Sequence, residues 1–302
     1  MTVTIAHISD IHLGPITGLT PRYWNAKRAM GFINWQRKRR LSFRRYVLDR
    51  LVVDLKAQNA DHIAVTGDLI NIGLPQEMEA AARWLASVGP PDRVAVIPGN
   101  HDIYTSMRGD CGIARWSAHM RGDDKTIPIG EFPYVRRVGD IALIGLNSAR
   151  ETPLFVAAGE LRAPQRARLS SILGELGREG VFRLVMIHHP PLPGQAKPGK
   201  ALSDAAQLAD LLARHGAELV IHGHNHRSML AHVGAQMTPV VGVPAASMSV
   251  AHPHEPLARY HLYHIDTSLS PATIEMVSRG LDRVDGDIVE LERVQLRPSD
   301  AR

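Results

Sequence analysis

Five short apolar runs in this 302-residue chain each end in a side chain that can bind a metal ion. The clearest run leads through Pro98 and Gly99 to Asn100, His101 and Asp102. It is β-branched and too short for a helix, and the Pro-Gly pair ends it abruptly, so it predicts a strand followed by a loop. Open α/β sheets bind ligands outside the carboxyl ends of their strands. The chain is therefore expected to be an α/β protein with its polar groups gathered at such an edge.

Four further runs have the same form and end in acidic or histidine side chains. They cover about residues 3–9, 62–66, 182–187 and 218–221 and lead, in that order, to Asp10 with His12, to Asp68, to His188, and to His224 with His226. Side chains two residues apart in an extended chain point the same way, so Asp10 and His12 can reach one ion. The same argument applies to His224 and His226. A capping aspartate beside a surface histidine would explain any one pair, so the prediction depends on the five runs together.

Asp68 and His188 need separate arguments. Gly67 lets the backbone turn tightly, so Asp68 can project from its strand end as a carboxylate shared by two cations must. A plain Asx turn is the alternative there. His188 and His189 are adjacent and cannot both face one ion, so His188 is the predicted ligand and His189 a supporting or packing residue.

The segments between the runs have the apolar spacing of helices packed on a sheet, at about 44–58, 78–88, 164–178 and 203–214. This β-α-β order predicts parallel strands with right-handed crossovers. Gly139-Asp140 is a hairpin signal between residues 134–138 and 141–146, so part of the structure should be antiparallel. Closing strands are expected at 229–233, 238–243, 260–265 and 273–278. We expect one domain over residues 1–280 and a charged surface tail over 281–302.

Two segments depart from this plan. An insertion at about 14–42 contains Tyr23, Trp24, Phe32 and Trp35, whose aromatic rings do not fall on one helical face. It is therefore not predicted to be a regular amphipathic helix. Residues 103–130 lack a clear period and contain several glycines, which indicates a loop-rich lid over the site.

Composition limits the chemistry and the location. Cys111 is the single cysteine, so any metal must be held by nitrogen and oxygen ligands, and the 16 histidines make these plentiful. Such ligands suit divalent transition-metal ions such as manganese, iron, cobalt or zinc. No stretch is long and apolar enough to cross a bilayer, and the chain opens like a strand without the pattern of a secretory signal. A cytoplasmic location is expected.

The net charge of +5 is concentrated in one segment. Residues 22–50 contain ten Lys or Arg and one acid, Asp49, whereas the rest of the chain has 25 basic and 29 acidic residues. One basic patch on an acidic body argues against a general nucleic-acid coat and for a local anionic partner. Because aromatic residues lie among the basic ones, an anionic membrane surface at the inner face is one candidate partner. A solvated insertion or an oligomer contact is the alternative.

Together the motifs resemble those of a known family. The motifs Asp10-Ile11-His12, Gly67-Asp68, Gly99-Asn100-His101-Asp102, His188-His189-Pro190-Pro191 and Gly223-His224-Asn225-His226 follow one another in the order and spacing of calcineurin-like metallophosphoesterases. The resemblance implies a four-layer α/β/β/α sandwich with mixed sheets and two metal ions between the sheet edges. It implies that one ion is held by Asp10, His12, Asp68 and His226, and the other by Asp68, Asn100, His188 and His224.

Two dications about 3.5–4 Å apart can activate a bridging water and clamp a phosphoryl group. Only two carboxylates face them, so the site should stay electropositive and suit a phosphate anion. His101 resembles the family histidine that stabilises the phosphorane or protonates the leaving oxygen, and Asp102 either orients it or caps a loop. Asn100, His101 and Arg150 are the candidate phosphate contacts, although for Arg150 the sequence favours a solvated surface arginine.

Three functions remain open. The first is a hydrolase of a lipid-linked phosphodiester or pyrophosphate, because the basic, aromatic insertion departs from small cyclic-nucleotide enzymes and is reminiscent of lipid A-pathway pyrophosphatases. The second is a soluble cyclic-nucleotide or glycerophosphodiester phosphodiesterase, since the His-His-Pro-Pro and Thr-Gly-Asp-Leu motifs look most like that bacterial branch. The third is a non-catalytic module that binds nucleic acid or a protein partner.

Overall fold

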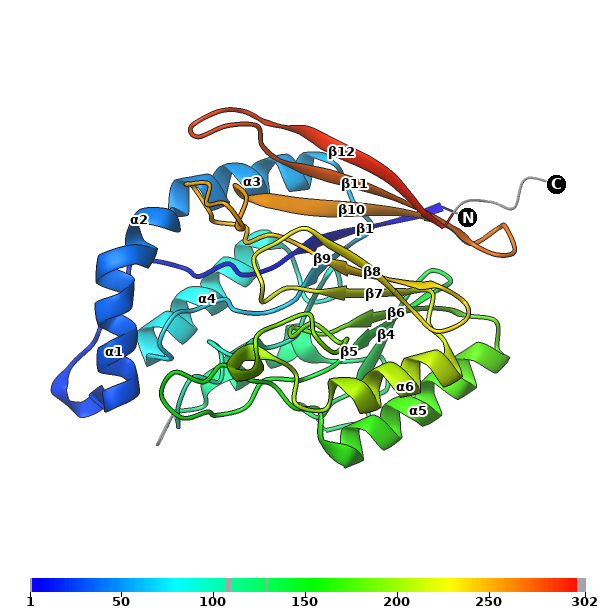
Figure 1. Cartoon of the computed structure of the whole chain (residues 1–302), viewed down its shortest axis with the longest axis horizontal. Helices are drawn as coiled ribbons and strands as arrows, with labels where there is room; N and C mark the ends of the chain where they lie inside the picture. Colours follow the sequence, from blue (N-terminus) through cyan, green and yellow to red (C-terminus); the bar gives the residue numbers. More distant parts are fainter. Residues whose placement is uncertain (1, 107–109, 129, 298–302) are drawn as a thin grey trace.

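The computed structural model describes all residues except 1, 107–109, 129 and 298–302. Two six-stranded sheets lie face to face (Figure 1). The first has the order β12 (Ile288–Arg297), β11 (Thr273–Leu281), β10 (Arg259–Asp266), β1 (Thr2–Ile8), β2 (His62–Val65), β3 (Val94–Val96). The second has the order β4 (Tyr134–Val138), β5 (Ile141–Gly145), β6 (Phe182–Met186), β7 (Leu219–His222), β9 (Thr238–Gly242), β8 (Met229–Val233).

Both sheets are mixed. Strands β1, β2 and β3 are parallel, as are β5, β6, β7 and β9, while β4, β8, β10, β11 and β12 pair antiparallel with their neighbours. The hairpin expected at Gly139-Asp140 joins β4 to β5. The expected α/β architecture with mixed sheets is therefore confirmed.

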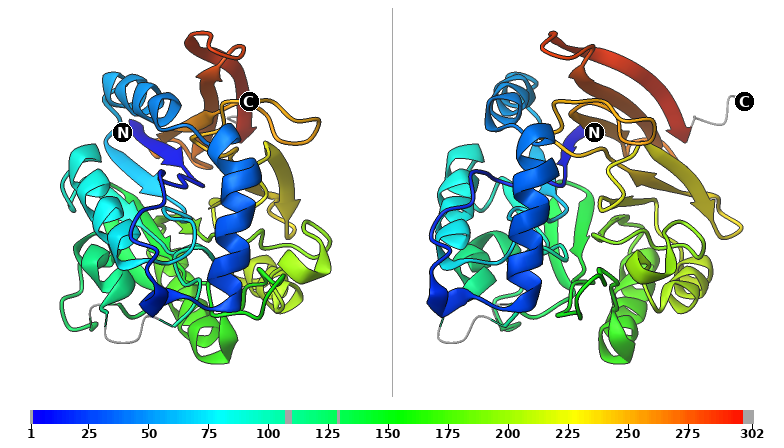
Figure 2. Two further views of the ribbon diagram at one scale, coloured as in Figure 1. Left: turned by 90° about the vertical axis from the view of Figure 1, so that its left-hand side faces the viewer. Right: turned by 60° about the vertical axis from the view of Figure 1, so that its left-hand side comes forward.

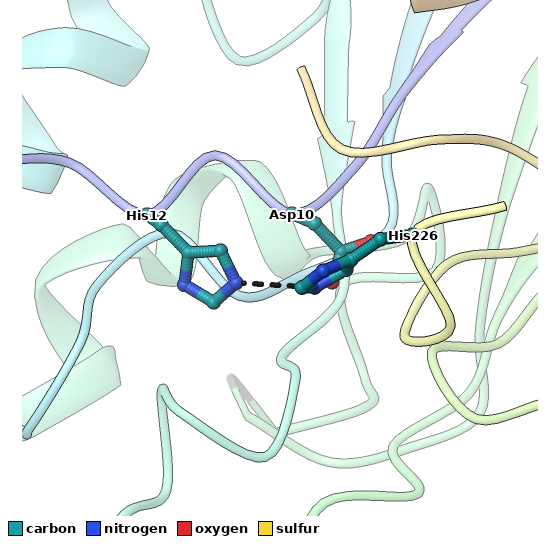
Figure 3. Close-up of side chains that lie close together, drawn as sticks. All are labelled: Asp10, His12 and His226. Atoms are coloured by element: carbon teal, nitrogen blue, oxygen red, sulfur yellow. Dashed lines mark hydrogen bonds and ion pairs between the residues drawn. The ribbon is translucent and has the colours of Figure 1, made fainter. Parts of the chain in front are cut away.

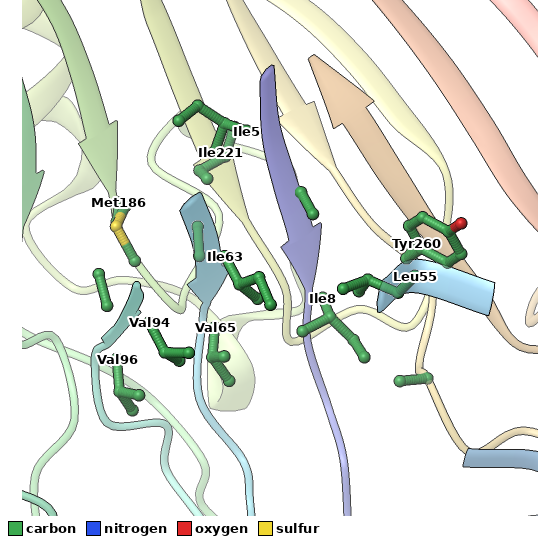
Figure 4. Close-up of a cluster of buried hydrophobic side chains, with 14 of the residues drawn as sticks. Ile5, Ile8, Leu55, Ile63, Val65, Val94, Val96, Met186, Ile221 and Tyr260 are labelled. Carbon is green, nitrogen blue, oxygen red and sulfur yellow. The ribbon is translucent and has the colours of Figure 1, made fainter. Parts of the chain in front are cut away.

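Helices cover the outer faces. α3 (Arg45–Ala57) and α4 (Pro75–Val88) cover the first sheet, and α5 (Arg162–Arg178) and α6 (Ala205–His215) cover the second (Figure 1). Each lies close to the range expected from its apolar spacing. Side chains of β5 alternate, so Ile141 and Leu143 enter the core between the sheets while Ala142 and Ile144 pack under the helices. Figure 4 shows part of the inner core, where Ile63, Val65 and Met186 come from both sheets.

Residues 26–42 of the insertion form a helix, although it is not a regular one. It begins at Ala26, where the Asn25 side chain accepts a hydrogen bond from the Arg28 amide, and runs through α1 (Ala26–Asn34), a π-helical segment (Trp35–Arg39) and α2 (Arg40–Ser42). Figure 2 shows these parts as one long helix. The π-helical segment changes the number of residues per turn, which explains why no single helical period was visible in the sequence.

The expected tail and lid also need correction. Residues 288–297 form β12, an edge strand on β11, whose charged side chains face solvent or pair across the strands, as Arg293 does with Glu275. Within the expected lid, Gly112–Met120 is a 3-10 helix that packs on α4 rather than over the strand ends. Residues 107–109 and 129 of the expected lid lie outside the described part of the chain.

Within the described ranges, no helix combines the length and apolarity that a membrane crossing needs.

Candidate metal centre

The seven side chains predicted as metal ligands lie together where strands of both sheets end. β1, β2 and β3 supply Asp10, His12, Asp68 and Asn100 from the first sheet, and β6 and β7 supply His188, His224 and His226 from the second. Five of the seven are almost completely buried, while His224 and His226 are partly exposed, His226 with 12% of its side chain. The folding of two sheets against each other thus brings together residues that are up to 216 positions apart in the sequence.

Three of these side chains form one half of the cluster (Figure 3). The Nε2 atom of His226 lies 3.3 Å from Oδ1 of Asp10, and the Nε2 atoms of His12 and His226 lie 3.4 Å apart. Oδ1 of Asp10 is buried and accepts no hydrogen bond from the described residues. A buried carboxylate oxygen of this kind needs a cation or a donor.

The other half is centred on Asn100. Its Oδ1 atom lies 3.1 Å from Nε2 of His188 and 2.9 Å from Nδ1 of His224. Oδ2 of Asp68 lies 3.5 Å from Nε2 of His188 and 3.9 Å from Nε2 of His12. Asp68 therefore stands between the two halves, where a carboxylate shared by two ions would be.

The outer nitrogens of the histidines are anchored to the backbone. Nδ1 of His12 donates to the Ile70 carbonyl at 3.2 Å, Nδ1 of His188 to the Thr66 carbonyl at 2.7 Å, and Nε2 of His224 to the Lys200 carbonyl at 2.8 Å. Each neutral ring therefore turns an unprotonated nitrogen toward the cluster. Facing lone pairs repel one another unless a cation lies between them, and such backbone anchors are usual for metal-bound histidines. The donors present fit two divalent ions with nitrogen and oxygen ligands.

Without a cation, the carboxylates favour the protonated form of two histidines of the cluster, His188 and His226. Burial opposes a charge on His188, but Asp68 raises its pKa to about 9. Burial likewise opposes a charge on His226, but Asp10 raises its pKa to about 9. A dication would displace both protons, because metal-bound histidine must be neutral.

The backbone at the centre is strained. Five of the seven residues have a positive φ without being glycine, a conformation that concentrates at functional sites. They are Asp10 (53°), His12 (45°), Asp68 (55°), His224 (70°) and His226 (55°). Gly67 permits one of these turns, because a Cβ atom there would overlap the backbone nitrogen of Gly99.

His101 lies beside the cluster. Its Nδ1 donates to the Asn71 carbonyl at 2.5 Å, and its ring stacks on Tyr104 with 5.5 Å between the centroids. Burial, together with Arg39, lowers the pKa of His101 to about 3, so the imidazole is neutral in the free site. The hydrogen bond to Asn71 leaves Nε2 as the ring nitrogen available to a substrate.

Asp102 caps a loop, which was the alternative role predicted for it. Oδ1 of Asp102 accepts from the Leu69 amide at 2.9 Å, and Oδ2 of Asp102 accepts from the Gly99 amide at 2.8 Å. The His101 ring is oriented by the Asn71 carbonyl instead. Burial raises the pKa of Asp102 to about 8. Asp102 therefore joins the loops after β2 and β3.

Glu77, which the sequence analysis missed, holds the same loop from the other side. This buried side chain at the start of α4 accepts from the Asn71 amide at 2.9 Å and from the Leu74 amide at 3.0 Å. Glutamate at the third residue of a helix that begins with Pro75 was a visible capping signal. The sequence did not show that the capped loop would carry the His101 partner.

Among the described residues, Arg150 makes no contact with the predicted metal ligands. Its Nη1 lies 3.8 Å from Glu160, and its side chain lines a separate cavity with Asn147, Gln165 and Arg168. None of the predicted ligands lines that cavity. The structure thus places Arg150 away from the predicted ligands, and its role as a phosphate contact stays a prediction.

A cleft of about 800 Å³ opens over His224 and His226. Its basic residues come from three segments, which are the insertion, the loop that follows β6 and the loop that follows β7. They are Lys38, Arg39, Lys197, Lys200 and Arg227. Glu255 is the one acidic residue in the described lining. The cleft therefore favours an anion and is large enough for a small organic ligand.

Comparisons with known proteins agree with this geometry. The family model described as calcineurin-like phosphoesterase matches residues 3–228. A probable cyclic nucleotide phosphodiesterase of Synechococcus sp. is 28% identical over 261 residues, which cover 85% of each chain. The glycerophosphodiester phosphodiesterase GpdQ of Enterobacter lignolyticus is 26% identical over 211 residues, or 68% of this chain and 69% of that protein.

Solved structures share the fold. A dimetal phosphatase from Danio rerio aligns with a TM-score of 0.64 at 14% identity, over 97% of this chain and 98% of that chain. The purple acid phosphatase PPD1 from yellow lupin seeds aligns with a TM-score of 0.58 at 12% identity, over 98% of this chain and 54% of that chain. At these identities the likeness concerns the fold alone.

Proposed function

Because the chain belongs to the calcineurin-like phosphoesterase family, we propose that it is a phosphodiesterase that cleaves a small, soluble phosphodiester at a dinuclear metal centre. The convergence of the seven predicted ligands, with Asp68 between the two halves, is the observation that supports this most. The named activities of the two relatives favour a cyclic nucleotide or a glycerophosphodiester. They support this soluble substrate better than the lipid-linked one that the insertion suggested.

The predicted ligands would form two metal sites that share Asp68. Asp10, His12, Asp68 and His226 would hold one ion, and Asp68, Asn100, His188 and His224 the other. The bound ions would supply an activated hydroxide and neutralise the charge of the phosphoryl oxygens. His101, held through Nδ1 by the Asn71 carbonyl, offers Nε2 to the leaving oxygen or to the phosphoryl group.

Turnover measurements test the proposal. Purified protein loaded in turn with manganese, iron, cobalt or zinc is assayed with an aryl phosphodiester, a cyclic nucleotide, a glycerophosphodiester and a phospholipid in vesicles. We expect metal-dependent turnover of at least one soluble diester that exceeds turnover of the lipid. Preference for the lipid would restore the first interpretation of the sequence. Absence of turnover with every metal and substrate would favour a binding module.

A second candidate function is attachment to an anionic membrane surface. The insertion exposes apolar side chains beside its basic ones, with Trp24 54% exposed, Ile33 43% and Leu41 50%. Arg37 and Arg40, on the same helix, are also exposed. Exposed aromatic and aliphatic residues among arginines are typical of surfaces that contact lipid headgroups. The relatives provide no support for this, and vesicle binding is the experiment that decides it.

A further inference from the structure

We propose that Arg39 of the insertion binds the phosphoryl group that is attacked at the metal centre. Arg39 would then be a substrate-contacting residue that comes from outside the ligand-bearing strand ends. The inference rests on the proposed function, because it supposes that a phosphate anion enters the cleft. It follows from where the guanidinium lies, from what surrounds it and from the charges that face it.

The first argument is position. Arg39 is the last residue of the π-helical segment and is partly buried, whereas Arg37 and Arg40 beside it are exposed and do not line the cleft. The Nη1 atom of Arg39 reaches to 3.5 Å from Nδ1 of His101. π-Helical turns are rare and often occur at functional sites. Here the turn accompanies the inward placement of one arginine of a basic run.

The second argument is how the guanidinium is held. Its Cζ atom lies 5.7 Å from the centre of the Phe43 ring, a cation–π contact. The Phe43 ring in turn packs edge-on against His12 and His226, with 4.9 Å and 5.6 Å between centroids. Arg39 is therefore fixed on a ring that itself rests on two of the predicted metal ligands.

The third argument is that the donors of Arg39 are available. Nδ1 of His101 already donates its proton to Asn71, so it cannot also accept from Arg39. Among the described residues, no carboxylate lies within ion-pair distance of the Arg39 guanidinium. Burial lowers the pKa of Arg39, and the carboxylate that most opposes this, Asp68, is itself a predicted metal ligand.

These observations leave an electrostatic problem that a substrate would solve. With two dications bound, Asp68 and Asp10 are neutralised, and a half-buried guanidinium next to them would be repelled. A phosphoryl oxygen between the guanidinium and the ions removes that repulsion. Arginine presents parallel donors that match phosphate geometry, which lysine does not. The same contact would strengthen as negative charge develops in the transition state.

The experiment compares Arg39→Ala and Arg39→Lys with a control in which Arg37 and Arg40 are both changed to Ala. All proteins are loaded with the same metal, and metal content and melting temperature are recorded. The affinity for inorganic phosphate is measured by calorimetry, and kcat and KM are measured with an aryl phosphodiester. Turnover of the alanine variant is then repeated with added guanidinium chloride at a concentration that leaves the wild type folded.

We expect Arg39→Ala to lose about 10²–10³-fold in kcat/KM, the scale of one removed donor to a charged transition state. Its phosphate affinity should fall at least about 10-fold, metal content should not change, and guanidinium should restore part of the turnover. Arg39→Lys should recover little, and the control should match the wild type. Unchanged phosphate affinity and turnover within twofold of wild type in Arg39→Ala would overturn the proposal, as would equal losses in the control.

Failure of the proposed function gives a different result. If wild-type protein hydrolyses no phosphodiester, the phosphodiesterase proposal fails, while phosphate calorimetry still decides whether Arg39 binds an oxyanion. If the alanine variant loses metal or unfolds, Arg39 is a structural residue and the inference is wrong.

Discussion

The cleft has two walls that are held in different ways. On the wall of strand ends, the ligand side chains are buried and their outer atoms are bonded to the backbone, as His12 is to Ile70 and His188 to Thr66. On the insertion wall, Phe32 and Trp35 stack on each other and pack on a small apolar cluster of Ile16, Ile72 and Leu74. Arg28 is buried there and donates to the Ile72 and Gly73 carbonyls, while most of the other charged residues face solvent or the cleft.

The two walls should respond differently to substitution. A side chain on the strand-end wall touches several others, so its replacement leaves buried polar groups without partners. Exposed charged residues on the insertion helix, such as Arg37 and Arg40, can change without disturbing the main core, because they make few buried contacts. We therefore infer that the strand-end wall determines the chemistry, while the insertion wall adjusts what is bound.

The largest expected effect is on the strand-end wall. Asp68→Ala should lose turnover more severely than His12→Ala, because Asp68 would serve both ions and His12 only one. Loss of even an indirect metal contact typically costs 10–100-fold in metal affinity or activity, so the turnover of each variant should fall at least about 10²-fold. Metal content and turnover of the two variants are measured. If the Asp68→Ala protein binds both metals and turns over at the wild-type rate, Asp68 is not the ligand shared by the two ions.

The next effect concerns His101. If it protonates the leaving oxygen, His101→Ala should lower kcat by about 10²–10⁴-fold with an alkoxide leaving group and much less with nitrophenolate, which leaves unaided. Both substrates are measured with the same metal. Equal losses on both would indicate phosphate binding by His101 instead.

A smaller effect is expected on the insertion wall. Arg37 and Arg40 of the insertion, and Arg44 just after it, are exposed and do not line the cleft, so changing all three to Ser should leave turnover of a soluble diester intact. Each basic residue near an acidic bilayer contributes about 1 kcal/mol, so binding to anionic vesicles should fall about 10²-fold.

Co-sedimentation with anionic and neutral vesicles at low and high salt measures this binding, which added salt should weaken. Arg39 and Lys38 are kept in this variant because they line the cleft. If the wild type ignores anionic vesicles at low salt, the membrane candidate is wrong and the insertion serves the cleft alone.

The smallest expected effect is on stability in acid, and it concerns the first sheet rather than either wall of the cleft. Burial lowers the pKa of His62 and of His261, both in strands of the first sheet, from 6.5 to about 3. Below pH 6.5 the unfolded chain therefore takes up protons that the folded chain does not, and stability falls as pH drops toward 3. The insertion, residues 14–42, contains no histidine.

His62→Leu should flatten the fall of the melting temperature between pH 6.5 and 4, whereas His254→Leu, at an exposed position, should not. The melts are run on metal-free protein, so that metal loss in acid does not contribute. Identical slopes in both variants and the wild type would show that the buried histidine in β2 is not responsible.

The fold class and the candidate ligands were readable from the sequence because their signals are local. A β-branched run followed by a turn predicts a strand end, and the residue after it is visible in the same few positions. Asp10, Asp68 and His188 each follow such a run, and the fold needs only to bring the ends together. The resemblance to a known family added the order of the motifs.

The remaining features were decided by tertiary structure, because they depend on contacts between distant segments. The carbonyl that anchors His101 belongs to Asn71, and Asp102 finds its donors at Leu69 and Gly99, partners that no spacing rule specifies. The charged residues 288–297 form a strand only because β11 offers an edge to pair with. The sequence placed Arg39 in a basic run, but only a π-helical turn against the strand ends set it apart from its neighbours.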